Sequence, residues 1–187
     1  MKEKITPQNF YSLFLREVEK SNIQLIPWNE NKKWTRKMLK GKDCIMKNIA
    51  DKLGLHYCNE YFMLDGIFFR KELKYKSYKG FGYAQNIEII LECENEHTTI
   101  EKEIYKLFPL FFAPLKVIIT YFSNNSVRHQ KAAEKIKGAI ENKIKTDDPF
   151  GLHKNKIKTL LIFGIKNKGE INWQAFVYFN GKFRPLT

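Results

Sequence analysis

The chain has 187 residues, of which 43% are hydrophobic and 28% charged, a balance that favours one globular domain and excludes a disordered chain. Its 33 Lys and Arg residues outnumber 20 Asp and Glu residues, and the net charge of +13 favours a polyanionic partner such as nucleic acid, an acidic protein or a membrane surface. The three cysteines form no CxxC pair, so neither a disulfide framework nor a zinc knuckle is indicated, and a reducing compartment fits.

The first half of the chain predicts two helices followed by two strands. Apolar residues at helical spacing indicate helices over residues 7–20 and 35–53, and Gly41 is a point where the second helix could be interrupted. The aromatic-rich segment over residues 57–70 is typical of a strand, and residues 83–94, which end in IEIILECE, predict a second strand. A basic, glycine-containing loop or hairpin lies between them.

The second half predicts a helix, a buried strand, a helix, a strand and a hairpin. Thr98 and Glu101 form a capping-box pattern that opens the helix. The run over 115–122 is typical of a central strand, and 127–144 and 157–165 favour a basic helix and another strand. Asn180-Gly181 predicts a tight turn between strands 171–179 and 182–185. We therefore expect an α/β fold with one domain over 1–187, in which helices flank a mixed β-sheet.

Three acidic residues, Asp65, Glu92 and Glu94, lie on two consecutive predicted strands. Side chains alternate along a strand, so Glu92 and Glu94 point to one face and Cys93 to the other. Asp65 lies on the preceding strand and can approach Glu92 if the two strands pair. Converging carboxylates repel one another unless a cation neutralises them, and Mg²⁺ prefers such oxygen ligands. The alternative is a solvated strand end.

Glu17 falls in the middle of the apolar stripe of the first helix. A carboxylate in that position is costly unless it is paired, hydrogen-bonded or bound to a metal. The alternative is an edge position from which the side chain extends into solvent.

Four features follow one another along the chain: Asp65-Gly66, the run Ile89-Ile90-Leu91-Glu92-Cys93-Glu94-Asn95, an amphipathic helix and the strand 115–122. Together they resemble the PD-(D/E)xK nuclease superfamily, which includes many restriction endonucleases. The resemblance covers about residues 8–122 and rests on layout more than on letters; residues 123–187 would form an extension. It implies a restriction-endonuclease-like core in which Asp65 and Glu92 hold the metal. Glu94 stands in place of the usual lysine, and Leu64 in place of the usual proline before the aspartate.

The resemblance implies a Mg²⁺-dependent DNA endonuclease, with Mn²⁺ as an alternative metal. Glu94 would bind metal or act as base, and Glu17 matches a fourth acid that the first helix of such enzymes often supplies. A homodimer acting on double-stranded DNA is implied by the resemblance alone. The rival hypotheses are an inactive nucleic-acid-binding protein on the same scaffold, for which the missing lysine is the best argument, and a basic protein that binds an acidic partner.

Two basic segments are candidates for phosphate contacts, because cationic side chains neutralise the nucleic-acid backbone. Each could instead be a solvated surface, the first as the polar face of a helix and the second as a hairpin. Their candidate residues are Lys32, Lys33, Arg36 and Lys37 in the first segment, and Lys71, Lys74 and Lys76 in the second.

Two further observations concern a possible phosphate contact and the location of the protein. His97 lies just past Glu94 and could approach a phosphate or a catalytic water. The N-terminus lacks the apolar core of a signal peptide, and the longest apolar run, Leu107 to Leu115, is about half a membrane span. We therefore expect a cytoplasmic protein with no membrane-spanning part.

Overall fold

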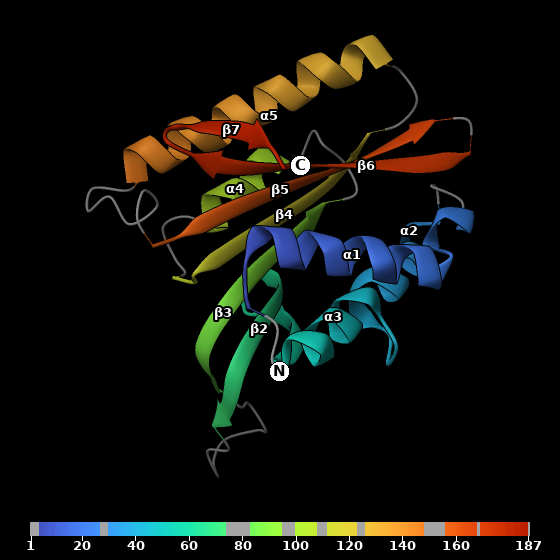
Figure 1. The fold of residues 1–187 in the computed structure, drawn as a ribbon, viewed down its shortest axis with the longest axis vertical. Helices are drawn as coiled ribbons and strands as arrows, with labels where there is room; N and C mark the ends of the chain where they lie inside the picture. Colours follow the sequence, from blue (N-terminus) through green and yellow to red (C-terminus); the bar gives the residue numbers. More distant parts are fainter. Residues whose placement is uncertain are drawn as a thin grey trace.

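The computed structural model describes residues 4–26, 30–73, 83–94, 100–107, 112–122, 126–147, 156–167 and 169–186. A single seven-stranded sheet forms its centre, and helices pack on both faces (Figure 1). The strands are β1 (His56–Tyr61), β2 (Leu64–Leu73), β3 (Tyr83–Glu94), β4 (Leu115–Phe122), β5 (Lys158–Asn167), β6 (Glu170–Phe179) and β7 (Lys182–Pro185). The fold is therefore mixed α/β, as the sequence predicted.

The strands lie in the sheet in the order in which they occur along the chain. β1, β2 and β3 form antiparallel pairs, β3, β4 and β5 pair in parallel, and β5, β6 and β7 are again antiparallel. Each parallel pair is joined by a helical crossover, as parallel connections require. The crossover helices are α4 (Ile100–Leu107) and α5 (Ser126–Asp147).

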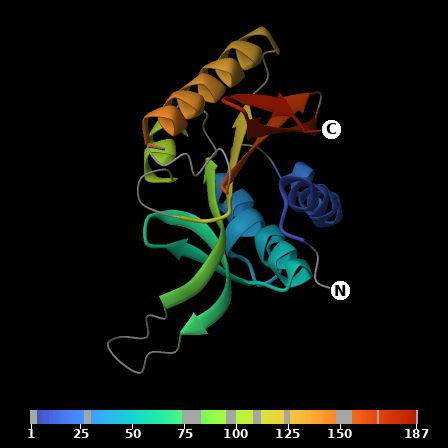
Figure 2. The same ribbon diagram turned by 60° about the vertical axis from the view of Figure 1, so that its left-hand side comes forward.

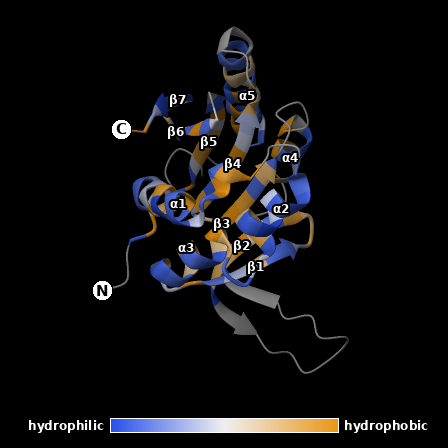
Figure 3. Cartoon of the chain, turned by 90° about the vertical axis from the view of Figure 1, so that its right-hand side faces the viewer, coloured by the Kyte–Doolittle hydropathy of each residue, from blue (hydrophilic) through white to orange (hydrophobic). Residues whose placement is uncertain are grey.

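Two apolar cores lie on opposite faces of the sheet (Figure 3). The first core receives the N-terminal helices, whereas α4 and α5 cover the second. The N-terminal segments are α1 (Pro7–Ser21), η1 (Ile23–Leu25), α2 (Asn31–Thr35), the π-helical turn η2 (Arg36–Lys40) and α3 (Ile45–Leu53). β4 is buried along its whole length because helices cover it on both sides. No helix within the described residues is long and apolar enough to cross a membrane.

Several predicted elements are confirmed. The strands predicted over 83–94 and 115–122 have those bounds, and α1 extends the predicted helix by one residue. Thr6 caps α1, since its side chain accepts a hydrogen bond from the N–H of Asn9 at 3.1 Å. Asn180 and Gly181 both have positive φ and join β6 to β7, as a two-residue hairpin turn requires.

One predicted boundary is wrong, and one predicted interruption is confirmed. The segment 57–70 is a hairpin of β1 and β2 that turns at Phe62 and Met63, rather than one strand. The segment 35–53 divides at Gly41, where the extended backbone ends η2 before α3 begins. The Cys44 sulfur accepts the N–H of Lys47 and caps the second piece. Apolar residues continue through the turn at Phe62 and Met63, which is why the pattern concealed that break, whereas Gly41 signalled the other one.

Candidate active site

The start of β2 and the end of β3 bring Asp65 to the Glu92–Glu94 segment. Gly66 pairs with Leu91, so Asp65 and Glu92 occupy the next position of this antiparallel strand pair. The Asp65 Oδ2 atom accepts a hydrogen bond from the backbone N–H of Cys93 at 2.8 Å. The sequence predicted that Asp65 would approach this segment if the two strands paired. The strands do pair, and Asp65 does approach the segment.

Gly66 lets an aromatic ring lie against β2 beside Asp65. A Cβ atom at this position would come 2.9 Å from Cε2 of Tyr57, which is closer than carbon atoms pack. The Tyr57 hydroxyl donates a hydrogen bond to the carbonyl oxygen of Leu39 at 3.1 Å. The glycine after Asp65 therefore allows Tyr57 to link β1 to η2.

Glu92 and Glu94 share the sheet face that α4 covers. Glu92 is in register with Ile118, which belongs to the core under α4 and α5, and Glu94 is in register with Thr120. Cys93 alternates with them and joins the opposite core. Only 1% of Glu92 is exposed, whereas Glu94 is half-buried. A carboxylate as buried as Glu92 is costly unless hydrogen bonds, a cation or protonation compensate it.

Burial and the carboxylates of this region raise the pKa of the Cys93 thiol. Burial raises its pKa well above the usual value, and the charge of Asp65 raises it further. Glu94 and Glu92 act in the same direction, while a hydrogen bond with Tyr121 lowers the pKa. The three carboxylates thus all raise the pKa of the same thiol.

The donor set suits a hard divalent cation. Mg²⁺ is usually bound by one or two carboxylates, with water and substrate phosphate oxygens completing its coordination. Asp65 and Glu92 could supply two such carboxylates. Among the described residues, however, no group of three or more His, Cys, Asp or Glu side chains is arranged to hold a metal ion. Any metal here would depend on water and substrate for its remaining ligands.

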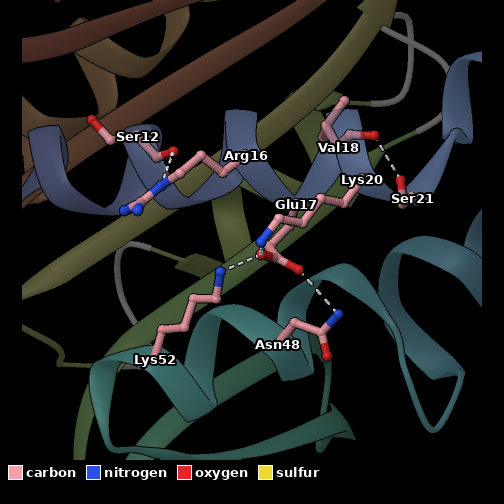
Figure 4. Close-up of polar contacts among 8 residues, drawn as sticks. All are labelled: Ser12, Arg16, Glu17, Val18, Lys20, Ser21, Asn48 and Lys52. Atoms are coloured by element: carbon pink, nitrogen blue, oxygen red, sulfur yellow. Dashed lines mark hydrogen bonds and ion pairs between the residues drawn. The ribbon is translucent and has the colours of Figure 1, made fainter.

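The structure places Glu17 in the contact between α1 and α3, against the sheet face opposite to Glu92 (Figure 4). Its Oε1 lies 2.5 Å from Nζ of Lys52, and its Oε2 accepts a hydrogen bond from Asn48 at 3.1 Å. Burial raises the pKa of Glu17, but the hydrogen bond and charge of Lys52, helped by Asn48 and Lys20, outweigh burial and hold the pKa below its usual value. Glu17 is not brought together with Asp65 and Glu92.

The first basic segment lies beside the carboxyl end of β3. Trp34 of α2 packs edge-on against Tyr121 with ring centroids 4.3 Å apart, and the Tyr121 hydroxyl lies 3.7 Å from the Cys93 sulfur. Lys32, Lys33 and Arg36 are exposed and Lys37 is half-buried. A shallow pocket of about 340 Å³ is lined by Lys33, Arg36 and Lys37 together with Lys42.

The second basic segment is farther from the carboxylates. Lys71 is six residues from Asp65 along β2, or roughly 20 Å at the usual rise of a strand. Lys74, Lys76 and His97 lie outside the described residues.

Two features escaped the sequence analysis. Lys116 is fully buried in β4, and its Nζ donates a hydrogen bond to the carbonyl oxygen of Leu107 at 2.7 Å. The Lys116 ammonium group thereby binds a carbonyl oxygen in the last turn of α4, where a cation is favourable. The sequence signal that could have revealed this contact was a single lysine within an apolar run. The second feature is the pair Phe62 and Met63, whose side chains are exposed at the β1–β2 turn.

No protein-family model, curated protein or solved structure matches this chain. Its function is therefore inferred from its own residues and their arrangement.

Proposed function

We propose that this protein is a metal-dependent nuclease that hydrolyses phosphodiester bonds in double-stranded DNA, with a restriction-endonuclease-like core. The observation that carries the proposal is the hydrogen bond from the N–H of Cys93 to Asp65. This bond fixes one acidic side chain of β2 against the residue that separates Glu92 from Glu94 on β3. Such a constellation is what the resemblance to the PD-(D/E)xK superfamily implied.

The order of elements around the carboxylates supports the same proposal. A helix precedes the antiparallel strands β1, β2 and β3, and a crossover helix then leads to β4, parallel to β3. This is the layout on which the resemblance was based with one strand added, because β1 and β2 replace the single strand expected over 57–70. The C-terminal extension adds β5, β6 and β7 to the side of β4 away from β3.

Each residue has a defined task in this proposal. Asp65 and Glu92 would hold Mg²⁺ or Mn²⁺, and Glu94 would act as a further ligand or as the base that orients water. The bound metal would supply Lewis-acid activation of water and neutralise charge on the phosphate. The Cys93 N–H keeps the Asp65 carboxylate in one orientation, and exposed cations of α2 and η2 would neutralise DNA phosphates next to the site.

The test compares the two site acids, Asp65 of β2 and Glu92 of β3, with Glu88, an acid of β3 outside the site. Wild type, Asp65→Asn, Glu92→Gln and the control Glu88→Gln are incubated with mixed plasmid and phage DNA in Mg²⁺, Mn²⁺ or EDTA. Glu88 pairs with Arg70 and is the control because its carboxylate is already engaged away from Asp65. We expect metal-dependent cleavage that falls about a hundredfold or more in the two site variants and is retained in the control. Cleavage that survives both site substitutions would contradict the assignment.

A second candidate is an inactive nucleic-acid-binding protein. It is favoured by Glu94 in the lysine position and by the lack, among the described residues, of a three-residue metal cluster. It predicts no cleavage in either metal, together with a mobility shift that weakens steeply with salt. A protein that binds an acidic protein partner instead would give neither DNA cleavage nor a mobility shift with DNA. We also propose a cytoplasmic location and a homodimer.

A further inference from the structure

The turn between β1 and β2 presents two large apolar side chains to solvent. Phe62 is 70% exposed and Met63 is 57% exposed. Figure 2 shows this hairpin projecting beyond the body of the sheet. Tyr61 pairs with Leu64 across the turn, so Phe62 and Met63 form its tip. An exposed pair of this size has no role in either apolar core.

The backbone of the turn disfavours the residues that occupy it. Phe62 has a φ of 54° and Glu60 a φ of 53°, in the left-handed region where Gly, Asn and Asp are the favoured residues. A phenylalanine at such a position violates both the backbone preference and the preference for polar turn residues. Violations of this kind concentrate at functional sites, because elsewhere nothing compensates them.

The tip is held firmly at its base. Leu64 is only 1% exposed and belongs to the core beneath α4, and the ring of Tyr61 packs edge-on against Phe62 with centroids 4.8 Å apart. Lys40 of η2 forms an ion pair with Glu60 on the other side of the turn. The apolar tip therefore has a fixed position beside the basic segment.

The tip also lies next to the candidate active site. Asp65 follows Met63 by two residues, and its carboxylate is bonded to the backbone of β3. Cationic side chains, an apolar wedge and a pair of carboxylates are thus gathered at one end of the sheet. Proteins that combine cationic phosphate contacts with an inserted apolar side chain unstack neighbouring bases and bend the duplex.

We propose that Phe62 and Met63 form a wedge that enters the base stack of bound DNA and positions the neighbouring phosphate at Asp65. The inference deepens the proposed nuclease function and rests on its DNA-binding part. The cations beside the tip favour DNA as the occupant over a second copy of this strongly basic chain, because two such surfaces would repel each other.

The experiment uses Phe62→Asn, since Asn tolerates positive φ and the substitution should not impair folding. Phe112→Asn is the matched control, because Phe112 is 69% exposed and precedes β4, whose amino end lies at the opposite end of the sheet. Binding is measured in EDTA, so that no cleavage occurs, with duplex DNA carrying 2-aminopurine, a base whose fluorescence rises when it unstacks.

We expect wild type and the control to raise the fluorescence on binding, and Phe62→Asn to bind about tenfold more weakly without that rise. Equal affinity and equal fluorescence for Phe62→Asn would overturn the wedge. A change of oligomeric state in Phe62→Asn, measured by size-exclusion chromatography, would overturn it by assigning the tip to a second copy. Phe62-dependent flotation with anionic vesicles, without DNA unstacking, would overturn it by assigning the tip to a membrane surface.

This design separates the two proposals. A fluorescence rise that depends on Phe62, in a protein that cleaves no DNA in either metal, would retain the wedge and refute the nuclease. Metal-dependent cleavage that requires Asp65, with no contribution of Phe62 to binding or unstacking, would retain the nuclease and refute the wedge.

Discussion

The ion pair between Glu17 and Lys52 offers a quantitative test of the structure, because the same glutamate was predicted from the sequence to be catalytic. The Glu17 side chain is 6% exposed and that of Lys52 is 34% exposed. The variant Lys52→Met keeps an apolar side chain of similar length and removes the charge. Glu17 would then retain Asn48 and the more distant Lys20, whose Nζ lies 3.7 Å from Oε1.

The expected loss lies between two measured limits. Exposed ion pairs contribute about 0.2–1 kcal/mol, whereas removing one partner of a fully buried pair costs about 3–5 kcal/mol. One member of this pair is buried and the other is one-third exposed. We therefore expect Lys52→Met to lower the free energy of unfolding by about 2 kcal/mol. In a chain of this length that loss corresponds to a fall in Tm of about 4–8 °C.

The effect has a defined pH dependence. The pKa of Glu17 is lower in the folded state than its ordinary value of 4.5, so the folded protein holds this carboxylate ionised more firmly than the unfolded chain does. The contribution is therefore fully present at neutral pH and is lost as the pH falls below 4.5 through the lowered pKa. The difference between wild type and Lys52→Met should shrink in the same range.

Urea denaturation followed by tryptophan fluorescence at neutral and acid pH measures these differences. Lys47→Met is the matched control, because Lys47 pairs with Asp51 on the same helix and the Asp51 side chain is 56% exposed; it should lose about 0.5 kcal/mol or less. A loss for Lys52→Met no larger than this control, or a loss that grows toward acid pH, would refute the reasoning. Glu17→Gln should also leave cleavage per folded molecule unchanged; a loss of cleavage there would restore its catalytic role.

Two further predictions concern the core beside the site. Gly164→Ala should lower the free energy of unfolding by about 1–3 kcal/mol, because the added Cβ would come 2.6 Å from Cδ1 of Tyr121 and 2.9 Å from Cζ3 of Trp173; thermal denaturation with no loss would contradict this packing. Burial raises the pKa values of Cys44 and Cys93, so a thiol reagent at mildly alkaline pH should label the half-buried Cys58 first and the other two only on unfolding. Rapid labelling of all three thiols in the native protein would contradict their burial.

The sequence predicted the sheet better than its edges. The apolar run over 115–122 predicted β4, and the apolar residues that lead to Glu92-Cys93-Glu94 predicted the end of β3. The alternation along β3 also placed Glu92 and Glu94 on one face. The break between β1 and β2 was missed because Phe62 and Met63 carry no turn signal, since their side chains are apolar and their backbone geometry favours other residues.

The limits of prediction at the candidate site have a similar cause. Asp65 could be placed near Glu92 from strand pairing alone, but its bond to the N–H of Cys93 depends on the register at the start of β2. The sequence placed Glu17 correctly on the apolar face of α1, since the residue is buried. Its partner Lys52 lies 35 residues away on α3. The periodicity of α1 alone could not predict which side chain of another helix would contact Glu17.

The agreement between strand order and chain order bears on how the protein folds during synthesis. Each new strand pairs with the one made just before it, so no strand has to insert between two that have already paired. Helix α1 departs furthest from this sequential assembly, because its Tyr11 hydroxyl donates a hydrogen bond to the carbonyl oxygen of Trp173, 162 residues later. Phe14 also packs edge-on against Trp173. The first helix to leave the ribosome is therefore among the last elements to complete its contacts, and the two ends of the chain become one cooperative unit only when β6 has been made.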